Sequence, residues 1–223
     1  MAHFAPAGQN AFGSIDIRRG GDLDSANGKG CTVAPYYADG NCTIYNANCD
    51  DVLPALGRFD LLLTEAPKYP PGLSDDNKAR MDSGLKVAAQ SNRIGALPEA
   101  GLQLAIEICD NAIVWRPDRY KLPIGRKLEW FCNNHQFSAA WHNIAAPRIM
   151  SWAPVRQFDR LRLFKQCIHF TPQANTILDP FMDTGDVLIA AISLRKNFVG
   201  IELDRVRCEH ALNRLLELRK TRS

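Results

Sequence analysis

Short apolar runs alternate with amphipathic stretches along most of the chain. A continuous apolar run such as FDLLLT (59–64) predicts a strand that is buried on both faces. Further strands are predicted at 41–47, 112–115, 127–133, 137–143, 176–181 and 198–204. Apolar residues at helical spacing predict helices at 49–56, 98–111, 158–170, 186–197 and 205–220. This order predicts an α/β protein with a mostly parallel sheet and helices on both faces.

The chain has 223 residues, 46% of them hydrophobic, which is enough for one domain with a substantial core. Residues 1–33 are rich in Gly, Ala, Asn and Asp and predict an N-terminal arm, followed by a single domain over 34–223. No apolar run approaches the roughly 18 residues that a membrane span needs. The first residues lack the charged and then apolar pattern of a signal sequence, so we expect a cytoplasmic protein that does not bind membranes.

The seven cysteines do not form a pattern typical of disulfide or metal-binding proteins. Their number is odd, and no two of them have the CxxC spacing. We therefore expect reduced and mostly buried thiols, and no metal site.

The net charge of +3 hides an uneven distribution. Residues 115–165 carry ten Lys and Arg against three acids, a balance of +7, together with nine aromatic residues that include all four tryptophans. Basic groups pair with phosphates, and aromatic faces stack on unpaired bases. A core of aromatic residues with a solvated basic rim would have the same composition, so both interpretations stay open at this point.

The segment 176–204 predicts a strand, a turn, a helix and a second strand that ends at Glu202. An acid about 20 residues beyond such a turn is placed to accept hydrogen bonds from ribose hydroxyls. Gly185 lies in the turn, where the chain passes close to a ligand or to its own helix. By itself this unit is compatible with any βαβ protein.

In its context, ILDPFMDTGDVLIAAISLRKNFVGIELD resembles the S-adenosylmethionine-binding end of DNA amino-methyltransferases, which read DPFxGSGTT, a helix and GIE. Upstream, TIYNANCDDVLPALGRFDLLLTEAPKY resembles the catalytic end of this family, where a strand runs into a DPPY motif. The motif order is that of the β-type members, which methylate adenine N6 or cytosine N4. The resemblance covers about 35–215 and implies a Rossmann-like methyltransferase fold.

The resemblance also assigns site residues. Catalytic positions fall on Glu65, Pro67, Lys68 and Tyr69, and cofactor positions on Asp179, Phe181, Asp183, Gly185 and Glu202. The region 68–165 corresponds to the part that meets DNA, which suggests nucleic-acid contacts by Arg116, Arg119, Lys121, Arg126, Lys127, Trp130, Arg148 and Arg156.

The catalytic motif departs from the family pattern. Glu65 replaces the DPPY aspartate and is longer by one methylene, a displacement of roughly 1 Å that can cost about 100-fold in rate. Lys68 replaces the aromatic ring that stacks on a flipped-out base, and Tyr69 stands one residue late for that role. A cation at this place would repel an amine that becomes positive during methyl transfer.

The cofactor motifs depart as well. Asp183 stands where the family has glycine, and it adds a negative charge where the carboxylate of the cofactor docks. Asp186 adds another. In a purely structural role, Asp183 would cap the following helix and Asp186 would complement its dipole. The usual GD pair has become AN at 47–48, and only Gln157 remains of the HPTQKP segment, at 154–159.

We therefore predict a catalytically inactive methyltransferase-like protein, with a cleft closed to a sulfonium donor and no cofactor, that acts by binding DNA, RNA or a protein. Such a partner could be another copy, an active methyltransferase subunit or a component of a defence system such as restriction–modification. The first alternative is a site-specific DNA methyltransferase that uses S-adenosylmethionine, with Glu65 and Tyr69 serving the base and Glu202 the ribose. The second is an assembly scaffold whose N-terminal arm wraps a neighbour.

Overall fold

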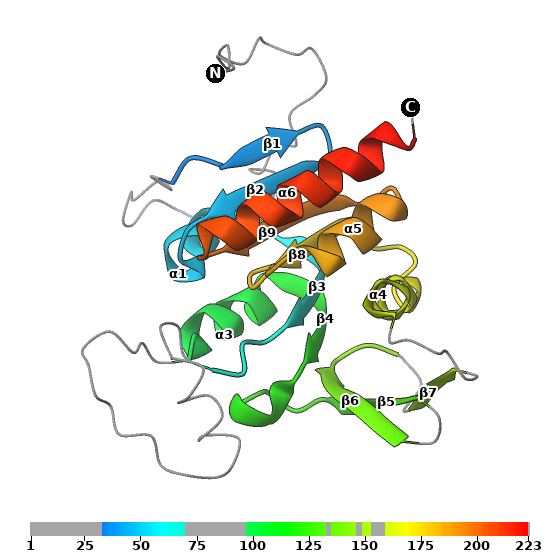
Figure 1. Ribbon diagram of the computed structural model, residues 1–223. Coiled ribbons are helices and arrows are strands. Elements are labelled where there is room, and N and C mark those ends of the chain that lie inside the picture. The colour runs from blue at the N-terminus through cyan, green and yellow to red at the C-terminus, as the bar shows by residue number, and fades with distance from the viewer. Residues whose placement is uncertain (1–32, 70–96, 133–134, 146–148, 153–158, 223) are drawn as a thin grey trace, which may run out of the picture.

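Nine strands form one mixed sheet in this computed structural model, which describes residues 33–69, 97–132, 135–145, 149–152 and 159–222 (Figure 1). The strand order is β1-β2-β9-β8-β3-β4-β6-β5-β7. The expected N-terminal arm, apart from residue 33, lies outside the described residues, as do residues 70–96. No helix of the described part is long and apolar enough to cross a membrane.

Five neighbouring strands in the middle of the sheet run parallel to one another. In sheet order they are β2 (Cys42–Asn46), β9 (Asn197–Glu202), β8 (Thr176–Asp179), β3 (Phe59–Glu65) and β4 (Cys109–Trp115). Leu61, Leu62 and Leu63 on the central β3 are fully buried, as expected of a strand that is covered on both faces. Because these strands are parallel, their carboxyl ends bring Glu65, Asp179 and Glu202 to one edge of the sheet.

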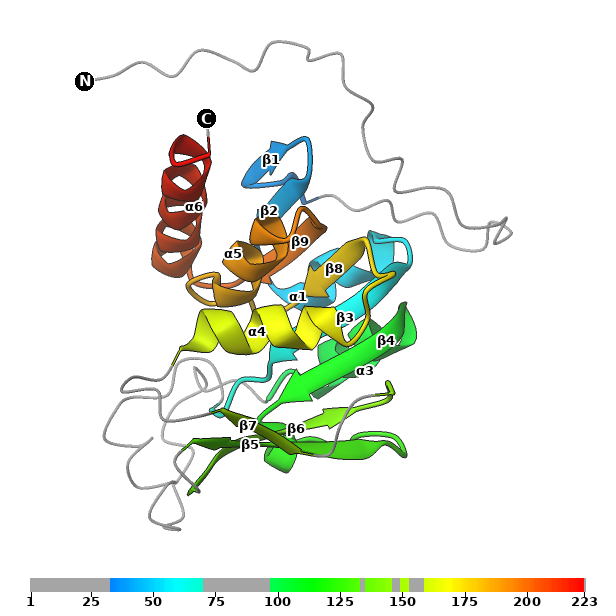
Figure 2. The same ribbon diagram turned by 90° about the vertical axis from the view of Figure 1, so that its right-hand side faces the viewer.

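Helices cover both faces of this parallel part (Figures 1 and 2). One core cluster packs the sheet against three helices: α4 (Arg160–His169), α5 (Asp186–Ser193) and α6 (Arg205–Lys220). The other cluster packs the opposite face against α1 (Cys49–Val52), the 3-10 helix η1 (Leu53–Ala55) and α3 (Glu99–Glu107). Asp159 and Asp204 cap α4 and α6, because each side chain accepts a hydrogen bond from a first-turn N–H.

Beyond β4 the sheet continues as an extension of β6 (His135–His142), β5 (Arg126–Cys132) and β7 (Ile149–Trp152). β6 runs antiparallel to both β4 and β5. Its pairing with β4 ends at Ala140, opposite Trp115, whereas its pairing with β5 continues to His135. The hairpin of β5 and β6 therefore projects past the carboxyl edge of the parallel strands. The 3-10 helix η2 (Pro117–Arg119) lies in the connection from β4 to β5.

The sequence-predicted elements are confirmed with two kinds of correction. The strands β1 (Tyr37–Asp39) and β7 were not predicted, because they are only three and four residues long. The predicted helix at 98–111 ends early, with α3 stopping at Glu107. Cys109 pairs instead with Phe59, because the backbone of 109–111 joins the parallel ladder beside β3.

Candidate functional site

A cleft of about 910 Å³ lies at the carboxyl edge of the parallel strands. Its volume is within the range of small-molecule pockets. We call the part around Glu65–Tyr69, Arg116 and Arg160 the catalytic end. The part around 179–186 and Glu202 is called the cofactor end. Both ends line the same cleft.

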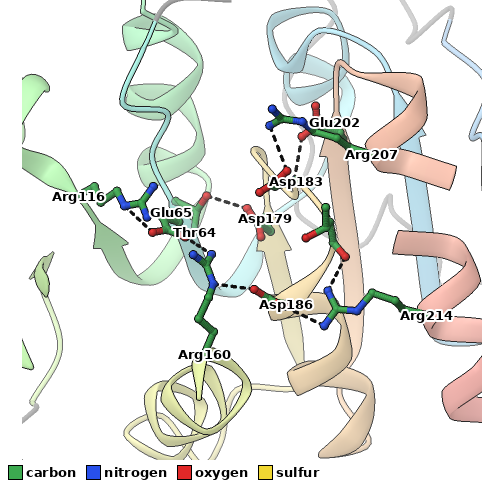
Figure 3. Close-up of polar contacts among 11 residues, drawn as sticks. Thr64, Glu65, Arg116, Arg160, Asp179, Asp183, Asp186, Glu202, Arg207 and Arg214 are labelled. Atoms are coloured by element: carbon green, nitrogen blue, oxygen red, sulfur yellow. Dashed lines mark hydrogen bonds and ion pairs between the residues drawn. The ribbon is translucent and has the colours of Figure 1, made fainter. Parts of the chain in front are cut away.

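At the catalytic end, two arginines hold the carboxylate of Glu65 (Figure 3). Arg116 Nε lies 2.6 Å from Glu65 Oε1, and the guanidinium of Arg160 contacts Oε2. The Glu65 side chain is 18% exposed, which limits screening of these ion pairs by water. Arg116 adopts a left-handed backbone conformation, with φ of 57°, directly after β4. Such a conformation is uncommon for a residue other than glycine and concentrates at functional sites.

Arg160 also connects the two ends of the cleft. Its Nε lies 2.6 Å from Asp186 Oδ2, and Arg214 contacts the other carboxylate oxygen of Asp186 at 2.8 Å. Burial alone would lower the pKa of Arg160, but the carboxylates of Glu65 and Asp186 raise it above its ordinary value. The result is a row of alternating charges, from Arg116 through Glu65, Arg160 and Asp186 to Arg214 (Figure 3).

The rest of the EAPK segment is also held by neighbours. The hydroxyl of Tyr120 donates a hydrogen bond of 2.8 Å to the carbonyl oxygen of Pro67. Lys68 Nζ lies 5.2 Å from the ring centroid of Tyr69, and the Arg119 guanidinium carbon lies 5.9 Å from it. These are cation–π distances. The ring that would have to stack on a base is therefore engaged with two cations.

At the cofactor end, backbone N–H groups fix the carboxylate of Glu202. The N–H groups of Asp183 and Asp204 donate to its two oxygens, each at 2.8 Å. Burial raises the pKa of Glu202 above its ordinary value. A carboxylate offers about four acceptor sites, so Glu202 can still accept hydrogen bonds from a ligand hydroxyl.

Asp179 lies beneath the cleft and is 2% exposed. Its Oδ1 accepts hydrogen bonds from the Thr64 hydroxyl at 2.7 Å and from the Phe181 N–H at 3.1 Å. Burial raises the pKa of Asp179 to about 7, although these hydrogen bonds oppose the shift. Asp179 thereby links β8 to β3 below both ends of the cleft.

In the turn between β8 and α5, Asp183 does not have the helix-capping role that was expected of it. The residue that precedes α5 as its N-cap is Gly185, not Asp183. Asp183 adopts a φ of 50° and pairs with Arg207 at 3.0 Å. Gly185 has a φ of 85°, and a Cβ there would lie 2.9 Å from the Cβ of Ala211 on α6. Asp186 does lie in the first turn of α5, as expected, and its charge is balanced by arginines.

Comparison with known proteins supports the fold that the motifs imply. No protein-family model and no curated protein sequence matches the chain. Among solved structures, M1.HpyAVI is similar with a TM-score of 0.52 and 15% identity, over 78% of this chain and 98% of that one. The chain has a DNA-methyltransferase-like fold. The family resemblance seen in the sequence is confirmed at the level of the fold.

Two further structures show weaker similarity. The M1.HpyAVI–SAM complex has a TM-score of 0.49 at 15% identity, covering 78% of this chain and 99% of that one. The cytosine-N4-specific PvuII DNA methyltransferase has a TM-score of 0.47 at 10% identity, covering 82% of this chain and 89% of that one.

In this methyltransferase-like fold, the described nucleic-acid candidates fall on one connected segment. Arg116 belongs to the catalytic end, Arg119 and Lys121 are exposed in the connection to β5, and Arg126 and Lys127 are exposed at the start of β5. Lys127 pairs with Glu129 at 2.8 Å. The side chain of Trp130, and the whole of Arg148, Arg156 and Gln157, lie outside the described residues.

The sequence did not reveal the partners of the acids in the cleft. Arg160 is 95 residues from Glu65 in the chain, so no local pattern indicates their contact. Arg207 and Arg214 gave a usable signal, because residues seven apart lie on one face of a helix. Two arginines on the same face of α6 could have suggested partners for Asp183 and Asp186.

Proposed function

We propose that this methyltransferase-like protein binds nucleic acid and does not transfer methyl groups. The observation that carries the proposal is the position of the Glu65 carboxylate between the guanidinium groups of Arg116 and Arg160. In the family that the sequence resembles, the acid at this position accepts a hydrogen bond from the target amino group. Here both of its oxygens already face cations.

The charge at the catalytic end opposes the reaction. Methyl transfer from a sulfonium makes the attacking amine positive, and preorganised groups must stabilise this charge. Two guanidinium groups contact the only carboxylate of the EAPK segment, and the ammonium of Lys68 lines the same cleft. Cations near a developing positive charge raise the barrier, more so in a partly buried site.

The proposed nucleic-acid contacts rest on the exposed cations between the cleft and the sheet extension. Arg119, Lys121 and Arg126 are exposed, and the stretch 119–128 contains no acid. Basic side chains in this arrangement replace the counterions of a phosphate backbone. The segment starts at the catalytic end of the cleft, so a bound strand would lie across the cleft mouth.

Affinity for a DNA duplex, measured at several salt concentrations, tests the binding role. Substitution of Arg126 and Lys127 by alanine is expected to weaken binding about ten-fold and to reduce the salt slope by about 0.9 for each phosphate that is no longer bound. The matched control replaces Lys196 and Lys220, near β9 and on α6, and should leave both quantities unchanged. Absence of wild-type binding, or equal effects of both double variants, would contradict this role and favour a protein partner.

A second candidate, an active DNA methyltransferase, is favoured by the size and lining of the cleft. The cofactor end fits a nucleoside, because Glu202 can accept ribose hydroxyls and the cleft measures about 910 Å³. S-adenosylmethionine, if bound, would supply an activated methyl group. The added charge of Asp186 is balanced by two arginines and need not repel the cofactor carboxylate, whereas the charge of Asp183 is offset only by a half-exposed ion pair with Arg207.

The two candidates predict different methylation of the DNA in a host cell that lacks other methyltransferases. Expression of the wild-type chain should leave this DNA without N6-methyladenine or N4-methylcytosine, as measured by mass spectrometry of its nucleosides. Either modified base, absent when Glu65→Ala is expressed instead, would establish the second candidate and overturn the first.

A further inference from the structure

The segment between η2 and β5 presents an apolar tip to solvent. Ile124 is 103% exposed, which makes it the most exposed of the large hydrophobic residues in the described part of the chain. Pro123 beside it is exposed as well. Single exposed apolar residues are common and need no explanation on their own. This tip differs from such residues in the way that the surrounding backbone is held.

Three hydrogen bonds anchor the chain on the N-terminal side of Ile124. The indole Nε1 of Trp141 donates to the carbonyl oxygen of Pro123 at 3.0 Å. The N–H of Lys121 donates to Glu99 Oε1 at 2.8 Å, and the side-chain amide of Gln103 donates to the Lys121 carbonyl oxygen. The segment is thus tied to both β6 and α3.

On the C-terminal side of Ile124, Gly125 fits tightly against β6. A Cβ at this position would lie 2.1 Å from Trp141 Nε1 and 2.9 Å from the carbonyl oxygen of His142. The backbone of Gly125 therefore packs directly on the ring of Trp141. With its neighbours fixed on both sides, Ile124 is held outward in a preorganised position, which lowers the entropic cost of binding.

Cations surround the tip. Lys121 and Arg126 are exposed on either side of it, and Lys127 follows with its partner Glu129. Asp118 is the nearest exposed acid before Lys121 in the sequence. A rigid apolar point between two cations is complementary to a duplex, whose phosphates flank stacked bases.

We propose that Pro123 and Ile124 form a wedge that inserts between two base steps of duplex DNA, with Lys121 and Arg126 on the adjacent phosphates. This inference rests on the proposed nucleic-acid binding and specifies how it occurs. Isoleucine and proline are among the residues that unstack a base step and kink the duplex. Unpaired bases would instead be expected to stack on aromatic rings, which this tip lacks.

The wedge predicts that Ile124→Ser weakens duplex binding about ten-fold and abolishes bending, because an inserted side chain kinks the duplex. Bending is measured by energy transfer between dyes at the two ends of a short duplex. The salt slope should not change, because serine removes no charge. Ile124→Leu should retain both binding and bending.

Val206→Ser is the matched control, since Val206 is 74% exposed on α6, and it should behave as wild type. If the wild type binds duplex but Ile124→Ser binds and bends it equally well, the wedge is wrong while the proposed function stands. If the wild type binds no duplex DNA, both are overturned. A loss of affinity restricted to single strands would also overturn the wedge.

Discussion

The two ends of the cleft are held by different kinds of interaction. At the cofactor end, backbone N–H groups hold Glu202, and Gly185 packs its backbone against α6. At the catalytic end, side chains hold Glu65 through ion pairs with Arg116 and Arg160. The first arrangement depends on the path of the chain, and the second on the identity of a few side chains.

This difference suggests how a methyltransferase-like fold could lose its chemistry and keep its shape. A backbone contact survives most substitutions, because every residue except proline supplies an N–H. An ion pair depends on side chains, so a few substitutions that bring arginines to a carboxylate can occupy both of its oxygens, as at Glu65. We therefore expect substitutions at the cofactor end to act on stability and ligand affinity, and the catalytic end to remain without methyl transfer.

The largest effect is expected for Gly185→Ala at the cofactor end. The change forces a φ of 85° on alanine and brings its Cβ to 2.9 Å from Ala211. The free energy of unfolding should fall by about 3 kcal/mol, from the left-handed conformation and the overlap with α6 together. Gly40→Ala is the control, because nothing lies within 4 Å of its added Cβ. Urea unfolding curves that shift equally for both variants would contradict the packing role of Gly185.

A smaller loss is expected for Asp186→Asn, which removes the carboxylate shared by Arg160 and Arg214. These arginines are 30% and 32% exposed, so water partly replaces the missing carboxylate. The free energy of unfolding should fall by about 2 kcal/mol, measured in urea. Asp110→Asn breaks the ion pair with Arg58, which is exposed, and should change stability little. Equal losses for both variants would argue against a row of charges that connects the two ends.

Asp183→Gly should tighten S-adenosylmethionine binding about ten-fold, or about 1.4 kcal/mol. Glycine adopts a φ of 50° without strain and removes a carboxylate from the cofactor end. The ion pair with Arg207, which this change removes, is about half exposed and contributes little. Asp183→Asn keeps the side-chain size and removes the charge. Calorimetric titration of both variants therefore separates the effect of the charge from the effect of the side chain itself. No gain in either variant would mean that Asp183 does not limit the cofactor end.

The smallest effect concerns pH. Burial raises the pKa of Asp179 to about 7 in the folded protein, whereas its pKa in the unfolded chain is near 4. Between these two pH values the folded protein therefore binds more protons than the unfolded chain. The contribution of Asp179 thus makes the protein more stable at pH 6 than at pH 8, by about 1 kcal/mol. Asp179→Asn should flatten this part of the stability profile. If thermal unfolding of the variant depends on pH as in the wild type, Asp179 does not titrate in this pH range.

The sequence predicted the layers of the fold better than the site. Buried runs such as 59–64 predict a doubly covered strand by themselves, because periodicity is a local property. Apolar residues at helical spacing likewise predicted the helices that the structure shows as α4 and α6. The motif positions Glu65 and Glu202 do face one cleft, as the family resemblance implied.

The balance of charge in the cleft was not predicted. Asp183 and Asp186 were expected to repel a cofactor, and this stays a prediction. The structure adds that Asp186 is paired with Arg160 and Arg214, and that Asp183 forms a half-exposed ion pair with Arg207. The contact of Arg160 with Glu65 depends on where α4 crosses the sheet edge, which no local sequence pattern specifies, whereas the spacing of Arg207 and Arg214 on α6 was a signal that the sequence did contain. The expected closure of the cleft to a sulfonium donor was inferred from the changed catalytic and cofactor motifs, and it stays a prediction. The absence of a cofactor stays a prediction.

Single-turnover methyl transfer tests the central claim most directly. Purified wild-type protein, in excess over unmethylated duplex, is mixed with methyl-tritiated S-adenosylmethionine, and the radioactivity on the DNA is counted over time. The account predicts counts equal to those of a sample without protein, even where titration shows that the DNA is bound. Time-dependent transfer of tritium that Glu65→Ala abolishes would contradict it.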